Sequence, residues 1–202
     1  MTQKTALVLV DVYNDFLHPD GKATGAISAS LTNSDTIVHI QQALQAARAA
    51  KIPVYNSLHQ QYHDGKYAGF ERRNPTLRSV ESSHAFEEGT FGAEIYKGLE
   101  PDPKNGDVVI SKHWNQSSFK NIDLDWQLRQ RNITDLVFAG LVANTCIETT
   151  ARMANEEGYK VTMLNDATAG WTIEAMKAAV EYSWLSFAHE VISTEEWQKR
   201  LA

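Results

Sequence analysis

The sequence predicts an α/β protein built on a doubly wound, mostly parallel six-stranded sheet with helices on both faces, in three layers. Short apolar runs rich in β-branched residues alternate along the chain with helix-type patterns. Each run is continuously apolar, which is typical of strands buried on both faces. The strand order expected for such a fold is 3-2-1-4-5-6. With 202 residues, 43% of them hydrophobic, the whole chain, 1–202, is expected to form a single domain.

Each predicted strand is a short apolar run, and each predicted helix follows a residue that can cap it. In the first helix Ile37, Ile40 and Leu44 share one face, and Thr172 caps a later one. The expected strands are 6–10, 52–58, 107–111, 134–139, 160–164 and 190–192, and the expected helices are 34–50, 123–131, 146–157, 172–184 and a last turn from 194.

The segment from 59 to about 106 breaks this alternation. It is rich in glycine and proline, carries mixed charges and contains only a short helix-type stretch at 93–98. So long an irregular connection in a compact domain is usually functional. We therefore expect this segment to form a lid or a substrate loop.

Composition excludes several classes of partner. The net charge is −6 and no cluster of Lys and Arg is present, which argues against nucleic acid and anionic membranes as partners. The one cysteine cannot form an intrachain disulfide and fits a reducing compartment. The apolar run at 6–10 is too short for a signal peptide or a membrane span, so a cytoplasmic protein is expected.

Cys146 is that single cysteine, and it falls at the first turn of a helix entered from a strand. Backbone N–H groups are unpaired at a helix start and the helix dipole favours an anion there. This position is expected to lower the thiol pKa from about 8.5 toward neutrality, which would make Cys146 a nucleophile. The alternative is a buried structural cysteine that packs as a small hydrophobic residue.

Three ionisable side chains fall at the carboxyl ends of predicted strands: Asp11, Lys112 and Cys146. In doubly wound sheets ligands bind beyond this edge. Asp11 can accept the thiol proton, and the charge of Lys112 can favour both the carboxylate and the thiolate. Strand alternation is expected to point the adjacent His113 the other way. Alone, Asp11 reads as a turn carboxylate and Lys112 as a solvated lysine, but together the three favour catalysis.

The sequence resembles the isochorismatase-like cysteine hydrolases, which include nicotinamidases, carbamoylsarcosine and ureidoacrylate amidohydrolases, and biuret hydrolases. The resemblance spans nearly the whole chain outside 59–106, and four matching segments carry it. They are 9–16, 112–119, 140–152 and 166–169.

The resemblance implies an Asp-Lys-Cys triad, carried here by Asp11, Lys112 and Cys146. It also implies a cis peptide bond at Leu141-Val142 and an oxyanion hole formed by the backbone N–H groups of Val142 and Cys146. By the same resemblance the protein is expected to be a homo-oligomer, a dimer or a tetramer.

Two departures from relatives within this family bear on the chemistry. Nicotinamidases bind a metal through an Asp-x-His motif, where this chain reads Ser57-Leu58-His59, so the carboxylate is missing. His59, His63 and His84 remain as candidate ligands, but the sequence favours no metal and no cofactor. True isochorismatases cleave a vinyl ether and can dispense with the cysteine, so the presence of Cys146 favours covalent acyl transfer.

Candidate substrate-binding residues lie in the loops at the same edge. The aromatic candidates are Phe16, Trp114 and Trp171, with packing of the loops as the alternative role. Arg72 can hold a substrate carboxylate, and solvated surface charge is its alternative. Asn115 and Asn144 can bind an amide or urea group.

The sequence thus predicts a hydrolase that acts on a small-molecule partner. It cleaves a non-peptide C–N bond of a small amide, carbamoyl or ureido compound through a thioester on Cys146. Two alternatives stay open: a vinyl-ether hydrolase of the isochorismatase type, and a catalytically silent binding protein on the same scaffold.

Overall fold

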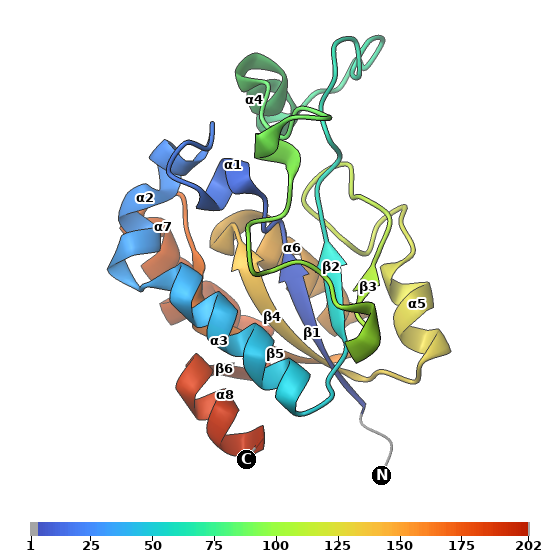
Figure 1. Cartoon of the computed structure of the whole chain (residues 1–202), viewed down its shortest axis with the longest axis vertical. Coiled ribbons are helices and arrows are strands. Elements are labelled where there is room, and N and C mark those ends of the chain that lie inside the picture. The colour runs from blue at the N-terminus through green and yellow to red at the C-terminus, as the bar shows by residue number, and fades with distance from the viewer. Residues whose placement is uncertain (1–3, 202) are drawn as a thin grey trace.

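The computed structural model describes residues 4–201, and its centre is a parallel sheet of six strands (Figure 1). The strand order is β3-β2-β1-β4-β5-β6, so the predicted order 3-2-1-4-5-6 is confirmed. The central pair, β1 and β4, comes from segments about 130 residues apart, in the register that aligns Val10 with Gly140. The strands are β1 (Thr5–Val10), β2 (Val54–Ser57), β3 (Val108–Val109), β4 (Asp135–Leu141), β5 (Lys160–Ala169) and β6 (Glu190–Ile192).

Helices cover both faces of the sheet and complete the three layers. One face packs on α2 (Thr24–Asn33), α3 (Thr36–Ala49) and α8 (Thr194–Leu201), and the other on α5 (Leu124–Gln130), α6 (Glu148–Glu156) and α7 (Ile173–Ala178). Within residues 4–201, no helix has the length and apolarity needed to cross a membrane.

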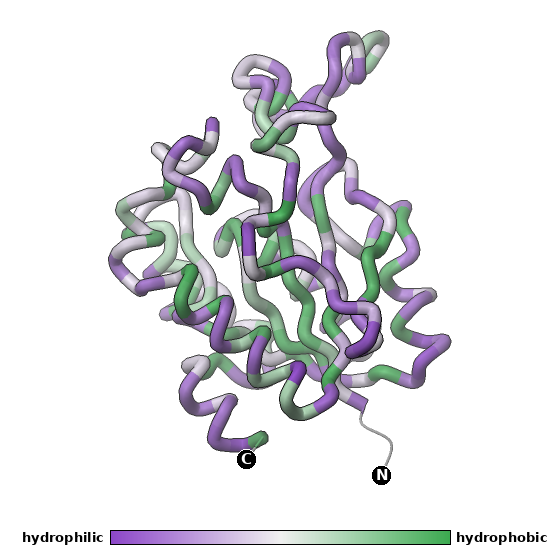
Figure 2. Tube along the Cα trace, viewed as in Figure 1, coloured by the Kyte–Doolittle hydropathy of each residue, from purple (hydrophilic) through white to green (hydrophobic). Residues whose placement is uncertain are grey.

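Alternation along β1 divides the hydrophobic core between these two faces. Leu7 and Leu9 belong to the core cluster that includes residues of α3 and α8, whereas Val8 and Val10 belong to the cluster that includes residues of α5 and α6. Figure 2 shows the hydrophobic residues concentrated along the central strands and the polar ones on the outer surfaces of the helices. Because both faces are covered, the strands read as continuous apolar runs in the sequence.

The segment 59–106 contains a helix that the sequence analysis did not predict. It is α4 (Pro75–Ser83), and the Asn74 side chain caps it by accepting a hydrogen bond from the Leu77 N–H at 3.0 Å. An Asn before a Pro at the first helical position is a recognised start signal. The helix expected at 93–98 is wrong, since only a 3-10 turn, Phe91–Ala93, forms nearby.

Short helices and turns complete the chain. The four-residue helix α1 (Asn14–Leu17) follows β1 and lies with α4 at the carboxyl end of the sheet (Figure 1). The 3-10 turns Pro103–Asn105 and Trp184–Ser186 and the π turns Ala143–Ile147 and Ala179–Ser183 interrupt the remaining connections.

Gly140 allows β1 and β4 to meet closely just before the site. Its φ of +113° lies in a region that favours glycine, and a Cβ there would lie 2.1 Å from the Val10 carbonyl oxygen. No side chain fits at this point without moving the backbone of β1.

We expect Gly140→Ala to lower the free energy of unfolding by roughly 3 kcal/mol or more, since backbone strain adds to the collision with Val10. Chemical denaturation measures this loss. Gly25→Ala is the control, because a Cβ at Gly25 in α2 meets nothing within 4 Å. That variant is expected to be neutral or more stable by up to about 1 kcal/mol. Equal stability of the two variants would contradict the close approach.

Candidate active site

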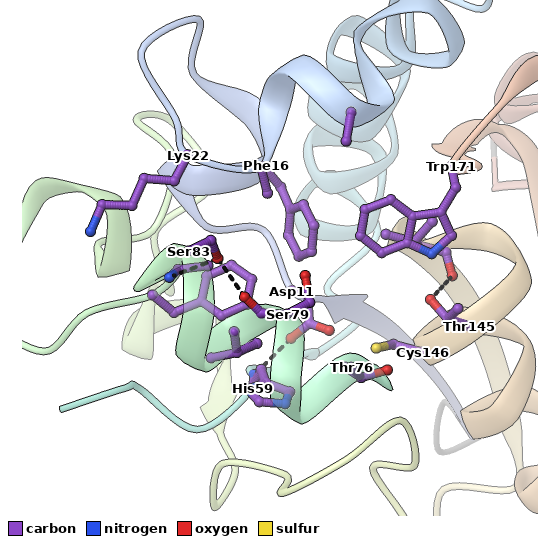
Figure 3. Close-up of a pocket in the computed structure, with 16 residues that line it drawn as sticks. Asp11, Phe16, Lys22, His59, Thr76, Ser79, Ser83, Thr145, Cys146 and Trp171 are labelled. Carbon is purple, nitrogen blue, oxygen red and sulfur yellow. Dashed lines mark hydrogen bonds between the residues drawn. The ribbon is translucent and has the colours of Figure 1, made fainter. Parts of the chain in front are cut away.

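Asp11 is the centre of the site and directly follows β1. It is 1% exposed and adopts a left-handed φ of +53°. Its Oδ1 accepts hydrogen bonds from the backbone N–H of His59 at 2.7 Å and from Nε2 of His113 at 3.0 Å. No nitrogen or oxygen of the described residues hydrogen bonds Oδ2. Figure 3 shows this free side of the carboxylate turned toward the Cys146 sulfur.

His113, and not Lys112, contacts the Asp11 carboxylate, which corrects the expected orientation of these two side chains. The pairing of β2 with β3 resumes past the strand ends, where His113 N–H donates to the Leu58 carbonyl at 2.9 Å. This bridge turns the buried His113 ring toward Asp11. The Nζ of Lys112 donates to Gln61 Oε1 at 2.9 Å, and neither of these residues is among those that line the cavity beside Asp11. Residues 110–112 are irregular, so alternation counted from β3 predicts the wrong phase.

Cys146 lies in the π turn Ala143–Ile147 that leads from β4 into α6. Its thiol is buried, and the Leu141–Val142 peptide bond at the end of β4 is cis. One ligand atom each from Asp11, His113 and Cys146 lie within 4.8 Å of one another. The fold therefore gathers the ends of β1 and β4 and the bridge beyond β3 around one thiol.

The charges of this cluster contradict the lowered thiol pKa expected at a helix start. Burial, followed by the negative charge of Asp11, raises the pKa of the Cys146 thiol well above its ordinary value. Burial also acts to raise the pKa of Asp11, but the charge and hydrogen bond of His113 outweigh it and hold that pKa below its ordinary value. The resting site is therefore a protonated thiol beside a carboxylate.

A cavity of about 170 Å³ opens beside Asp11 and Cys146. Of the predicted substrate-binding residues, Phe16 and Trp171 line it, with ring centroids 6.1 Å apart. Val142 and His59 line it as well. The other lining residues come mainly from α2 and the loop before it and from α4 and the loop after it: Lys22, Ala23, Ala26, Thr76, Ser79, Val80, Ser83, Ala85, Phe86 and Thr145.

Four predicted substrate-binding residues are not among those that line this cavity. Trp114 is 42% exposed and packs against Phe70. Asn115 Oδ1 accepts a hydrogen bond from Asn74 Nδ2, and Asn144 Oδ1 accepts a long one of 3.5 Å from the backbone N–H of Trp171. Arg72 is exposed and also lies outside the lining.

The three candidate metal-binding histidines are spread over the site and the surface. His59 lines the cavity, His63 is exposed and His84 lies 3.6 Å from a Glu87 oxygen. In the part of the chain from 4 to 201, the group of side chains close enough to share an ion is Asp11, His113 and Cys146. This group is the candidate catalytic cluster itself.

An acid and a thiol at the carboxyl edge of a parallel sheet, beside a cavity, form the arrangement of a hydrolytic enzyme. A family model described as the isochorismatase domain matches residues 5–196, and the chain belongs to that family of isochorismatase-like hydrolases.

Relatives include a ureidoacrylate amidohydrolase, RutB, of Methylobacterium radiotolerans, 33% identical over 178 residues. That match covers 81% of this chain and 66% of the relative, just under two thirds. The uncharacterized isochorismatase family protein YddQ of Bacillus subtilis is 30% identical over 84% of this chain and 80% of its own length.

Solved structures agree with the fold. A cysteine hydrolase from Pseudomonas syringae pv. phaseolicola superposes with a TM-score of 0.81 at 27% identity, over 98% of this chain and 92% of that one. An N-carbamoylsarcosine amidase from Thermoplasma acidophilum superposes with a TM-score of 0.72 at 25% identity, over 96% and 98%.

The side chain of Asp15 in α1 holds together two segments that line the cavity. Its buried carboxylate accepts backbone hydrogen bonds from Lys22 at 2.9 Å and from Phe86 at 2.6 Å. Lys22 and Phe86 both line the cavity and are more than sixty residues apart. One carboxylate thus ties the loop before α2 to the loop after α4.

We expect Asp15→Asn to destabilise the protein by roughly 1–3 kcal/mol, because the amide NH₂ would face a buried N–H and leave it unpaired. Thermal and urea unfolding measure the loss. Asp20→Asn is the matched control, since the Asp20 side chain is 85% exposed, and its effect should stay within about 0.5 kcal/mol. A loss no larger than that of the control would show that Asp15 does not hold the wall.

Proposed function

We propose that this protein is a cysteine hydrolase that cleaves a non-peptide C–N bond of a small amide, carbamoyl or ureido compound through a thioester on Cys146. The observation that carries the proposal is the free side of the buried Asp11 carboxylate beside the Cys146 thiol at the cavity wall. The amidohydrolase and amidase among the similar proteins support the same reaction class.

In the proposed reaction Asp11 takes the proton from Cys146 as the sulfur attacks the substrate carbonyl carbon. The backbone N–H groups of Val142 and Cys146 stabilise the oxyanion. Asp11 returns its proton to the leaving nitrogen, the C–N bond breaks, and ammonia or an amine departs. Asp11 then deprotonates a water that attacks the thioester, and its proton returns to the sulfur as the acid leaves.

The lining of the cavity favours a small uncharged substrate with an apolar body. Phe16, Val80, Phe86 and Trp171 supply apolar surface, and hydroxyl groups from α4 add polar contacts. The cation in the lining is Lys22, whose Nζ already donates to Glu87 at 2.9 Å and to the His84 carbonyl at 2.7 Å. A carboxylate on the substrate would therefore compete with an existing ion pair.

Cys146→Ser is expected to keep the fold and to lose at least about 10³-fold in turnover, since a serine alkoxide is far harder to form than a thiolate. Ammonia release from a panel of small amides and ureas finds the substrate and measures the loss. In the wild-type protein, intact mass spectrometry should trap the acyl adduct on Cys146.

Two results would overturn the proposal. One is turnover by Cys146→Ser within tenfold of wild type. The other is cleavage of isochorismate by Cys146→Ala near the wild-type rate while neither protein consumes any amide, since a vinyl ether has no acyl carbon for the thiol to attack.

A further inference from the structure

We propose that His113, as an imidazolium, supplies the positive charge of this site in place of the lysine that the family resemblance implies. Its role is to position Asp11 and to stabilise the thiolate of Cys146. The inference shares one premise with the proposed function, namely that Cys146 is the nucleophile.

Both ring nitrogens of His113 face oxygen acceptors. Nε2 lies 3.0 Å from Asp11 Oδ1, and Nδ1 makes a short hydrogen bond to the Asn115 carbonyl. A neutral imidazole has a single N–H and would turn a lone pair toward one of these oxygens. The ring is fully buried, so bulk water cannot relieve that contact. Both hydrogen bonds can form only when each ring nitrogen carries a proton, that is, when the ring is an imidazolium.

The groups that face His113 favour this charge. Burial acts to lower the pKa of His113, but the carboxylate of Asp11 and then the Asn115 carbonyl outweigh it and raise that pKa above the ordinary 6.5. Beyond β2, His59 has its ring centroid 5.3 Å away and is neutral, because burial and then the charge of His113 lower its pKa to about 4. From the π turn the facing group is the protonated Cys146.

An imidazolium at this place balances the charge before and after the proton transfer. At rest it pairs with the Asp11 carboxylate. Once Asp11 has taken the proton, the negative charge resides on Cys146, still within 4.8 Å of both partners. Without that cation the step would create an unpaired buried thiolate, which is strongly unfavourable. Lys112 is not placed for this role, because its Nζ donates to Gln61 Oε1 and neither residue lines the cavity.

With a histidine as the cation, the site loses its positive charge at a lower pH than it would with a lysine. While Asp11 is ionised, the contribution of the charged His113 is fully present below pH 6.5 and is lost as pH rises through the raised pKa of His113. A lysine, with an ordinary pKa of about 10.4, would hold its charge far higher. Reactivity of Cys146 should therefore fall on the alkaline side, opposite to the rise that simple thiols show.

Alkylation of Cys146 by iodoacetamide, followed by intact mass from mildly acidic to alkaline pH, tests this without any substrate. His113→Gln should slow alkylation at neutral pH by at least about tenfold, the effect of one pKa unit. His113→Lys should restore most of the rate and move the alkaline fall to higher pH. Lys112→Met is the matched control and should stay within about twofold of wild type.

Circular dichroism reports whether each variant folds. If His113→Gln does not fold, the pH dependence of Cys146 alkylation in the wild-type protein and in His113→Lys still tests the inference. A wild-type rate that only rises with pH, or a loss in Lys112→Met with none in His113→Gln, would overturn the inference. Amide turnover by His113→Gln at the wild-type rate would also overturn it and leave the proposed function intact. If no amide, carbamoyl or ureido compound is hydrolysed, the proposed function is wrong, but the alkylation experiment still tests the role of His113.

Discussion

The buried carboxylate of Asp11 is the interaction on which the candidate site depends. A charge removed from water needs partners, and Asp11 takes them from two other strand ends, the His59 backbone and the His113 ring. These bonds hold the segments after β2 and β3 against the end of β1. Because they occupy one carboxylate oxygen, the other stays free for the thiol that arrives from β4.

The parallel sheet makes this meeting geometrically necessary. All six strands run the same way, so every connection that leaves a carboxyl end begins at the same edge. The close contact of Gly140 with Val10 brings the two central strands together just before Asp11 and Cys146. The cavity wall then comes from α1 and α4, which Asp15 fastens through backbone hydrogen bonds.

The electrostatics of the cluster favour a protonated Cys146 thiol in the resting site, which loses its proton only when it reacts with substrate. Burial and the Asp11 charge both keep the proton on Cys146, although the sulfur sits at the entrance to a helix. Burial, together with the full charge of the carboxylate within 4.8 Å, outweighs the partial backbone charges at the start of the helix. Reaction then requires a proton transfer inside one buried, charge-balanced group.

The sequence by itself determined the elements with strong periodicity. Continuous apolar runs and capping residues determined six strands that alternate with helices, and the order of the strands followed from the fold class that this alternation defines. The segments around Asp11 and Cys146 determined the family. Strand ends are readable because burial on both faces leaves an unbroken apolar signal. The Asn74-Pro75 pair that begins α4 was also readable, although it lies in a segment of broken pattern.

Only the tertiary structure decided between Lys112 and His113. The backbone between β3 and His113 is irregular, and the phase is set by a hydrogen bond from His113 to Leu58, more than fifty residues away. The thiol pKa and the cavity lining were decided in the same way, by burial and by segments that meet only after folding. Local periodicity encodes regular elements, but the direction of a side chain beyond an irregular stretch depends on its distant partners.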